Sequence, residues 1–443
     1  MSSSAIASHS AIATGASPIS LDESALYRKI TWRLIPFLFV CYVLSYLDRS
    51  NVGFAKLQML DDLQMSSAVY GLGAGIFFVG YFIFEVPSNL ILHRVGARRW
   101  IARIMVSWGL LSAATAFVTN PTSFYVIRFL LGVAEAGFFP GVILYLTYWY
   151  PAERRGRIVA MFIAAIPISG VIGGPISGAI MTYADQIWQL RGWQWMFLLE
   201  GLPTVILGIV TWFYLTDRPS EAKWLTSEQK QTVAHIIEAG ERDKPDTSVK
   251  SGLVGAKVLL LCAVYFLLLM GLYGLGFWLP TILSAAGAKS PLQVGLLTAI
   301  PYGCSVVAMI VVSRHSDKVL ERRWHLAIAA VAGAAGLVGS VLAFNNEVLA
   351  MIAFCVATMG IMSTLPLFWT LPTAFLGGLA AAAGIAFITS VGNLAGFASS
   401  YAIGWLKELT SSTEAGMYLL AGSLVLAAIL VLSITSQGVR KIS

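Results

Sequence analysis

Long apolar segments separated by short polar turns dominate this sequence. Of its 443 residues, 57% are hydrophobic and only 12% are charged, whereas a soluble domain carries about 25% charged residues. A helix needs about 20 apolar residues to cross a bilayer. Segments of that length lie at 33–54, 68–92, 98–118, 122–148, 156–182, 194–216, 257–284, 292–313, 324–343, 348–371, 378–404 and 414–435. The sequence therefore predicts an all-α membrane protein with twelve transmembrane helices.

The basic residues lie mostly on one side of this topology. If both termini are cytoplasmic, Lys and Arg gather near the termini and in the loops after the second, fourth, sixth and eighth helices. The exceptions among the 29 are Lys56, Arg191, Lys289 and Lys407 outside, and Arg49 and Arg128 within apolar segments. This is the positive-inside pattern. It accounts for the net charge of +7, so we expect membrane lipid and no nucleic acid as a partner.

Residues 217–256 form the long hydrophilic stretch that divides the chain into halves. We expect a disordered N-terminus at 1–25, a six-helix bundle at 26–216, this linker, a second six-helix bundle at 257–436 and a tail at 437–443, with both termini cytoplasmic. Within the linker, Thr226 and Gln229 have the spacing of a capping box. They predict a short surface helix that ends at Gly240.

The two halves repeat. A shift of 224 residues places Gly71 and Leu72 on Gly295 and Leu296. The same shift places His93, Arg94, Arg98, Arg99 and Trp100 on Asp317, Lys318, Arg322, Arg323 and Trp324. One helix pair with its basic turn thus occurs twice, as in transporters built from related halves. The two bundles are therefore expected to be pseudo-symmetric.

Four charged residues stand out inside the apolar segments of the first half. Asp48 and Arg49 lie in the first segment, and Arg128 and Glu135 lie seven residues apart in the fourth. A charge at the bilayer centre costs roughly 3 kcal/mol or more, so such residues usually have a function. The two arginines fall at similar depth and suggest a fork for a carboxylate. The two acids can balance them when the site is empty and take up protons when it is full. The alternative is a pair of structural ion pairs.

Apart from Lys257 and Glu414 at their ends, the spans of the second half contain no Lys, Arg, Asp or Glu, so shape and hydrogen bonding are expected to act there. Trp369 and Asn393 are our candidates for substrate contacts, and Tyr46 and Tyr81 are further candidates in the first half. The alternative for Trp369 is packing, and for Asn393 a hydrogen bond between helices. The repeat of Gly170, Gly174 and Gly178 is interpreted as close helix packing. Glu85 and Glu200 are interpreted as structural.

Sequence patterns for enzymes and metal sites are absent. The five histidines lie in the N-terminal tail or in predicted cytoplasmic loops, and no metal-ligand spacing, nucleophile elbow or phosphate loop occurs. We therefore expect no catalytic residue, no metal and no cofactor. Protons are the expected coupling ion.

Several motifs resemble those of a known family. Residues 89–99, Asn-Leu-Ile-Leu-His-Arg-Val-Gly-Ala-Arg-Arg, resemble the cytoplasmic signature of the major facilitator superfamily. Residues 46–51 and 128–140, which contain the four intramembrane charges, are similar to its anion:cation symporter branch, and 84–89 and 192–195 fit that branch. Bacterial permeases for tartrate, hydroxyphenylacetate and phthalate look most similar. The resemblance covers about residues 25–435.

This resemblance implies proton-coupled uptake of a small organic carboxylate by alternating access. The cargo would be an acid such as tartrate or an aromatic acid. We expect the protein to be a monomer in the bacterial inner membrane. Asp48 and Glu135 match the branch's proton-coupling carboxylates, and Arg128 matches its substrate-facing arginine. Arg49 is either a second substrate ligand or the partner of Asp48.

The resemblance also implies a cytoplasmic gate, formed by His93, Arg94, Arg98, Arg99, Asp317, Arg322 and Arg323. Asn89 replaces the usual glycine and His93 the usual acid of that signature. We therefore expect the first half to lack a carboxylate–arginine lock, which Asp317 can supply in the second half. Because Gly170–Gly178 resembles an antiporter motif, an exchanger or exporter remains the alternative. A non-transporting membrane sensor is the second alternative.

Overall fold

The computed structural model describes residues 22–242, 255–343, 345–375 and 378–434. The predictions for 1–21 and 437–443 lie outside these residues. Within them, the long elements are helices: α1 (Glu23–Asp62), α2 (Ser67–Val95), α3 (Ala97–Ala114), α4 (Pro121–Glu135), α5 (Phe138–Thr147), α6 (Ala152–Ile163), α7 (Ala165–Tyr183), α8 (Gly192–Tyr214), α9 (Ser227–Arg242), α11 (Ala256–Ala285), α12 (Pro291–Val319), α13 (Arg323–Leu342), α14 (Glu347–Phe375), α15 (Gly378–Thr410) and α16 (Glu414–Ser433).

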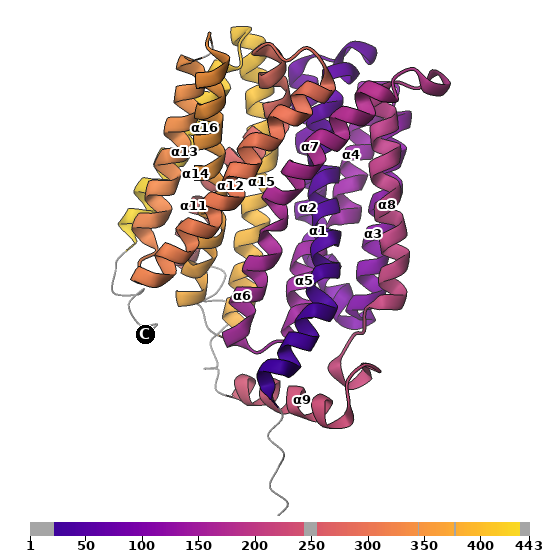
Figure 1. The fold of residues 1–443 in the computed structure, drawn as a ribbon, viewed down its shortest axis with the longest axis vertical. Helices are drawn as coiled ribbons and strands as arrows, with labels where there is room; N and C mark the ends of the chain where they lie inside the picture. The colour runs from indigo at the N-terminus through magenta and orange to yellow at the C-terminus, as the bar shows by residue number, and fades with distance from the viewer. Residues whose placement is uncertain (1–21, 243–254, 344, 376–377, 435–443) are drawn as a thin grey trace, which may run out of the picture.

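The predicted spans coincide with these helices. Eleven helical segments of the described chain are long and apolar enough to cross a membrane. The remaining predicted span, 378–404, lies within α15, a helix of 33 residues. Helices α1–α8 form one half of the molecule and α11–α16 the other, and they stand side by side in Figure 1. The two-bundle architecture expected from the sequence is therefore present.

The fourth and fifth predicted spans are each broken, which the sequence analysis did not anticipate. Span 122–148 divides into α4 and α5, because Gly137 adopts a left-handed conformation with φ +86°. Pro140 follows three residues later, and a proline ring clashes with the carbonyl four residues before it. Span 156–182 divides into α6 and α7 at Ala164. The break after α4 makes Glu135 the last residue of that helix.

The linker helix α9 marks one end of the molecule, here called the linker end, and the opposite end is called the far end (Figure 1). The predicted capping box forms, since Gln229 N–H donates to Thr226 Oγ1 and Thr226 N–H to Gln229 Oε1, both at 3.2 Å. The predicted stop at Gly240 is wrong by two residues, because α9 continues to Arg242. Trp224 stacks on Trp149 with ring centroids 5.5 Å apart, so the linker packs against the first half.

The internal repeat is confirmed by the helix boundaries. Helices α2 and α12 each contain 29 residues, and both of their ends differ by the 224 residues of the sequence shift. Their glycines serve the same purpose in the two halves. Gly71 of α2 lies against the Ser400 carbonyl of α15, and Gly295 of α12 lies against the Gly174 carbonyl of α7. The pairs α2–α15 and α12–α7 thus join the halves in a pseudo-symmetric way.

The far end is closed by these close helix contacts. A Cβ added to Gly295 would lie 2.1 Å from the Gly174 carbonyl oxygen, and one added to Gly178 would lie 2.4 Å from that of Pro291. On the other side, a Cβ on Gly404 would lie 2.5 Å from the Ser67 carbonyl oxygen. The predicted packing role of the Gly170–Gly178 stretch is therefore confirmed. Little space remains between the halves at this end.

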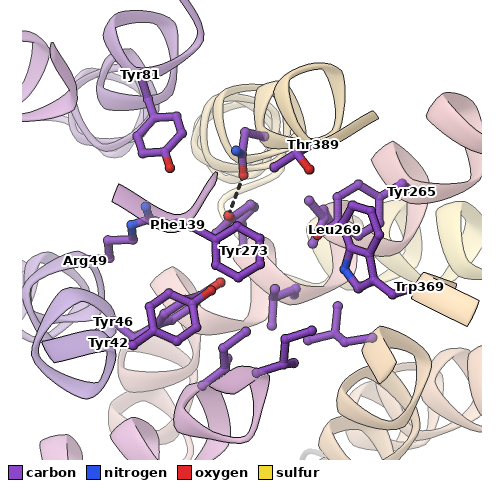
Figure 2. Close-up of a pocket in the computed structure, with 15 residues that line it drawn as sticks. Tyr42, Tyr46, Arg49, Tyr81, Phe139, Tyr265, Leu269, Tyr273, Trp369 and Thr389 are labelled. Atoms are coloured by element: carbon purple, nitrogen blue, oxygen red, sulfur yellow. Dashed lines mark hydrogen bonds between the residues drawn. The ribbon is translucent and has the colours of Figure 1, made fainter. Parts of the chain in front are cut away.

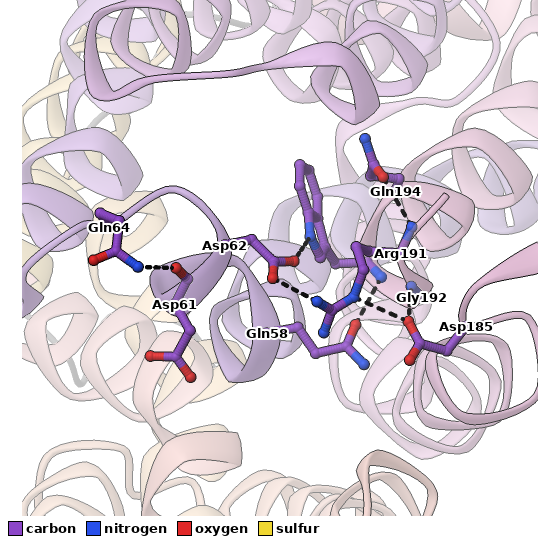
Figure 3. A network of polar contacts seen from close by, with 9 residues as sticks. Gln58, Asp61, Asp62, Gln64, Asp185, Arg191, Gly192 and Gln194 are labelled. Carbon is purple, nitrogen blue, oxygen red and sulfur yellow. Dashed lines mark hydrogen bonds and ion pairs between the residues drawn. The ribbon is translucent and has the colours of Figure 1, made fainter. Parts of the chain in front are cut away.

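A polar network also fixes the far end of the first half (Figure 3). Arg191 Nη1 bonds Asp62 Oδ1 at 2.7 Å and Arg191 Nε bonds Asp185 Oδ1 at 3.3 Å. Trp193 Nε1 donates to Asp62 Oδ2 at 2.7 Å. The end of α1 is thus held to the start of α8, and the first half keeps its own shape at this end.

Candidate functional site

A cavity lies between the two halves, near the middle of α1, α2, α11 and α15 (Figure 2). The space between its wall atoms amounts to about 420 Å³, part of which is open to solvent. Arg49 is the charged residue among those that line it. The others are aromatic, aliphatic or neutral polar: Tyr42, Tyr46, Tyr81, Phe139, Ile163, Ile166, Tyr265, Leu269, Leu272, Tyr273, Leu365, Trp369, Thr389 and Asn393. The cavity therefore presents one cation in a mostly aromatic wall.

The cation of this cavity is paired with a carboxylate from α4. Arg49 Nε donates to Glu135 Oε1 at 2.7 Å, and Ser45 Oγ donates to the same oxygen at 2.7 Å. Arg49 is 6% exposed and Glu135 is 1% exposed. Glu135 Oε2 has no hydrogen-bond partner in the described structure. Because the ion pair uses the Nε edge of the guanidinium, the terminal nitrogens remain for the Tyr81 hydroxyl and for a further carboxylate.

Asp48 faces away from the cavity and does not pair with Arg49. Its carboxylate accepts hydrogen bonds from Trp108 Nε1 at 2.8 Å, Ser112 Oγ at 2.7 Å and Thr204 Oγ1 at 2.9 Å. These donors lie on α3 and α8, inside the first half. Consecutive residues of a helix point about 100° apart, so Asp48 and Arg49 cannot face the same way. The suggested Asp48–Arg49 partnership is therefore wrong in this structure.

Arg128 does not line the cavity either, and the expected two-arginine fork is not formed. The side chain is fully buried, and its Nη2 donates a long hydrogen bond of 3.4 Å to the Ala74 carbonyl. Its Nε and Nη1 have no hydrogen-bond partner among the described residues. Phe77 lies against both arginines, 5.0 Å from the Arg128 guanidinium carbon and 5.5 Å from that of Arg49. The depth estimate placed the two arginines near each other, but Phe77 packs against both guanidiniums.

The predicted contacts of the second half do line the cavity. Tyr273 Oη donates to Asn393 Oδ1 at 2.9 Å, which fixes the orientation of that amide (Figure 2). Trp369 packs edge-on against Tyr265 with ring centroids 5.0 Å apart. From the first half, Tyr46 and Tyr81 face the same cavity. Their ring centroids lie 5.4 and 5.0 Å, respectively, from the Arg49 guanidinium carbon. Their positions agree with the sequence analysis, and their roles remain predictions.

A second cavity continues from the first toward the far end. The space between its wall atoms amounts to about 550 Å³, part of which is open to solvent, and it shares Tyr46, Arg49 and Tyr273 with the first. Gly170, Gly174 and Thr298 belong to its wall, where α7 meets α12. The close glycine contacts lie at this end of the second cavity. The two cavities together form an interior space with Arg49 at its middle.

Two further buried acids lie outside the cavities. Glu85 of α2 accepts a hydrogen bond of 2.7 Å from Ser390 Oγ of α15, across the two halves. Glu200 of α8 accepts one of 2.6 Å from Ser177 Oγ of α7, within the first half. Both are buried carboxyl groups that join helices, in agreement with a structural role. In the described residues, no group of three or more His, Cys, Asp or Glu side chains could hold a metal ion.

The predicted gate residues lie at the linker end, but their described hydrogen bonds and ion pairs stay within each half. Arg322 bonds Asp317 at 2.5 Å, and Arg323 bonds the Leu432 carbonyl. His93, Arg94 and Arg99 are exposed. The expectation that the first half lacks a carboxylate–arginine lock is wrong, because Asp217, the first residue of the linker, accepts from the Arg98 N–H at 2.7 Å and lies 3.9 Å from Arg98 Nε. Asp217 is distant in sequence, so the motif did not show it.

One titratable group in the turn between α12 and α13, in the second half, has a shifted pKa. Partial burial would raise the pKa of Glu321, but the Trp324 N–H, the His325 side chain and the His325 N–H hold it below its ordinary value. Glu321 thereby caps the start of α13 as an anion. His325 also contacts His315 at 2.8 Å between ring nitrogens.

Sequence analysis missed two tyrosines of the cavity, Tyr42 and Tyr265. Tyr42 belongs to the same face of α1 as Tyr46 and Arg49, since the three are spaced by four and three residues. Tyr265 and Tyr273 lie eight residues apart on α11 and face the cavity together. That spacing was the available signal. The spacing did not identify these residues, because in an apolar span the face that packs against a neighbouring helix has the same composition as the face that lines a cavity.

The chain is similar in sequence and in fold to known proteins. Residues 38–400 match the Major Facilitator Superfamily, and the chain belongs to that family. The xylose transporter XylE of Escherichia coli, in a partially occluded inward-open conformation, has the same fold, with a TM-score of 0.71 at 16% identity over 90% of this chain and 99% of that one. The protein is thus a multi-pass membrane transporter of the major facilitator type.

Three bacterial proteins are similar to this chain in sequence along most of its length. NicT of Pseudomonas putida, whose name suggests metabolite transport, is 50% identical over 96% of this chain and 98% of its own. A protein of Agrobacterium vitis, whose name suggests tartrate transport, is 50% identical over 93% of this chain and 91% of its own. A quinolone resistance transporter of Acinetobacter baumannii is 44% identical over 90% of this chain and 92% of its own.

Proposed function

We propose that this protein carries a small organic carboxylate across the membrane together with protons, by alternating access. The observation that carries the proposal is the ion pair between Glu135 and Arg49, the cation that lines the central cavity. Arg49 is the cation that faces the space between the halves, and its partner is an acid that can be neutralised. A carboxylate substrate and Glu135 would thus compete for one guanidinium.

This competition couples the substrate to protons. While Glu135 is ionised, it satisfies Arg49, and an incoming anion meets a neutral ion pair. Protonation of Glu135 leaves the charge of Arg49 unbalanced, so that a substrate carboxylate can take the place of Glu135 as its partner. Release of the substrate then allows Glu135 to lose its proton and pair again. Burial of Arg49 without an anionic partner costs free energy. The loss of one carboxylate partner, Glu135 or the substrate, therefore favours binding of the other.

The remainder of the cavity suits the other parts of an organic acid. Trp369, Tyr265 and Tyr46 offer aromatic faces, and Asn393 and Thr389 offer polar groups. A hydroxylated dicarboxylate such as tartrate and an aromatic acid are both compatible with this wall. The name of the Agrobacterium vitis relative supports tartrate as the first acid to test.

Alternating access is supported by how the halves meet. The glycine contacts of α7–α12 and α2–α15 close the far end. On the positive-inside rule, the linker end is cytoplasmic and both termini lie there. We therefore assign the far end to the periplasmic side of a bacterial inner membrane and this structure to a state closed to the outside. A monomer surrounded by lipid, with no cofactor, completes the proposal.

Asp48 and Arg128 keep their proposed roles as predictions. Two guanidinium nitrogens of Arg128 have no partner among the described residues, and Arg128 lies behind Phe77, so movement of that ring would bring it to the cavity. Asp48 is held by three donors inside the first half. We propose that it exchanges its proton in the opposite state, in which the helices around it rearrange.

Transport by proteoliposomes tests the proposal. Tartrate, hydroxyphenylacetate and phthalate are supplied outside, and accumulation is compared with and without an inward proton gradient. Glu135→Gln, which removes the exchangeable proton but keeps the shape, should abolish gradient-driven accumulation and retain exchange of labelled for unlabelled substrate. Asp48→Asn should lower accumulation in the same way. Full accumulation by both variants would show that the coupling acids are assigned wrongly.

An exporter on the same fold is the second candidate, because one relative is named for quinolone resistance. The same proteoliposomes distinguish the two functions. An exporter would move substrate against its gradient toward the far-end side when that side is acidic, whereas a symporter would move it toward the linker end.

A further inference from the structure

A lysine lies buried along the route from the far end to the cavity. Lys56 of α1 is 3% exposed, and its Nζ has no hydrogen-bond partner in the described structure. It follows Arg49 by seven residues, which places it on the same face of α1 and about 10 Å nearer the far end. Gly53, between them on this face, lies against the Phe277 and Gly276 carbonyls of α11. Lys56 therefore faces the second half, where the far end is closed.

Two aromatic rings cover this lysine. Its Nζ lies 3.0 Å from the ring centroid of Trp278, on α11 of the second half, and 4.6 Å from that of Tyr70, on α2 of the first. The two rings meet edge-on at 5.9 Å, and Tyr70 Oη donates to the Val52 carbonyl. Separation of the halves at the far end would remove Trp278 and expose the ammonium.

The charges around Lys56 are positive. Lys407 of α15, which like Trp278 belongs to the second half, places its Nζ 5.8 Å from the same ring. No described carboxylate forms an ion pair with either lysine. The nearby Glu408 accepts a hydrogen bond from the Ala68 N–H at the start of α2. A buried ammonium beside a second cation is unfavourable, and the aromatic rings compensate for only part of this cost.

We propose that Lys56 and Lys407 form an outer docking site for the substrate carboxylate, which Trp278 covers while the far end is closed. The site is exposed when the halves separate there, and the anion binds it before it moves to Arg49. This inference rests on the proposed transport of organic anions. It explains why two cations without acidic partners converge at the closure of an anion passage.

External and internal affinities test the site separately. Uptake of tartrate is measured in right-side-out and inside-out membrane vesicles for Lys56→Gln, Lys56→Arg and Lys289→Gln. Lys289 is an exposed lysine at the same end and serves as the matched control. Lys56→Gln should raise the external KM about tenfold, the factor that one lost charged contact gives. The internal KM should stay within about twofold, and Lys56→Arg and Lys289→Gln should resemble the wild type.

A purely structural role for Lys56 predicts the opposite result. If its contact with Trp278 only held the far end closed, its loss would increase the outward-open population and lower the external KM. An unchanged or lower external KM in Lys56→Gln therefore overturns the docking site. If Lys56→Gln does not fold, the external KM is measured instead for Lys407→Gln, which changes the half-buried lysine of the same site. Absence of transport of every acid by the wild type would refute the proposed function instead, so the two failures are distinguishable.

Discussion

At the scale of single residues, the adjacent pair Asp48 and Arg49 shows how a helix separates neighbours. Asp48 points into the first half and is bound by three donors, whereas Arg49 points to the cavity and pairs with Glu135. The position of the four charges within apolar segments, and the similar depth of the two arginines, predicted that all four belong to one site. The structure divides these buried residues into the Arg49–Glu135 pair, of which Arg49 lines the cavity, and two groups that lie away from it.

Arg49→Lys tests the value of the guanidinium fork. A lysine retains the charge opposite Glu135 but presents a point charge in place of two parallel donors. We expect the KM for tartrate to rise about tenfold, which corresponds to about 1.4 kcal/mol of binding, with little change in melting temperature. Uptake assays and thermal-shift curves measure both. Exposed Arg28→Lys is the control, and an unchanged KM in Arg49→Lys would argue against carboxylate binding at this position.

Tyr273→Phe tests the polar contact of the second half. Loss of its hydroxyl leaves Asn393 Oδ1 without the donor that orients it. We expect about 1 kcal/mol of lost stability and a severalfold higher KM for tartrate, because the amide can turn away from the substrate. Exposed Tyr418→Phe should change neither quantity. Equal behaviour of the two variants would remove Asn393 from the binding site.

At the scale of elements, two features position the site: the break between α4 and α5 and the glycine contacts between helices of opposite halves. The break ends α4 at Glu135, where the chain turns through Gly137. Gly137 and Pro140 were visible in the sequence, but apolar composition alone suggested one uninterrupted span. The glycine spacing at 170–178, in contrast, correctly predicted close packing.

Gly295→Ala should prevent tight closure of the far end. Its Cβ would meet the Gly174 carbonyl oxygen at 2.1 Å, a contact that only movement of α7 or α12 can relieve. We expect a lower transport rate, by about tenfold, and faster maleimide labelling of a cysteine introduced at Thr298 from the far-end side. Gly303→Ala is the control on the same helix, since no atom lies within 4 Å of its added Cβ. Identical labelling of the two variants would contradict the closure.

At the scale of the whole molecule, two related halves enclose a space in which one carries the charge and the other the shape. The repeat at 224 residues was readable from the sequence, and the equal lengths of α2 and α12 in the structure agree with it. The pairing of α2 with α15 and of α12 with α7 was not, because the repeat relates positions within each half and says nothing about contacts between them.

The orientation of the whole molecule is open to a direct test. The distribution of Lys and Arg predicts that the linker end is cytoplasmic. A cysteine at exposed His235, on α9, should react with a membrane-impermeant maleimide only after right-side-out vesicles are permeabilised. A cysteine at exposed Lys289, in the turn before α12, should react at once. The reverse pattern would invert the proposed topology and with it the assigned direction of uptake.

The sequence by itself determined the number and position of the spans, the two halves and the intramembrane residues that need an explanation. Hydrophobic composition and charge placement act along the chain, so they are readable without coordinates. Only the tertiary structure decided that Glu135 pairs with Arg49, that Asp48 and Arg128 lie away from the cavity, and that Lys56 rests against Trp278. Helical periodicity gives the face on which a residue lies relative to its own helix, but the neighbour of that face depends on how all the helices pack.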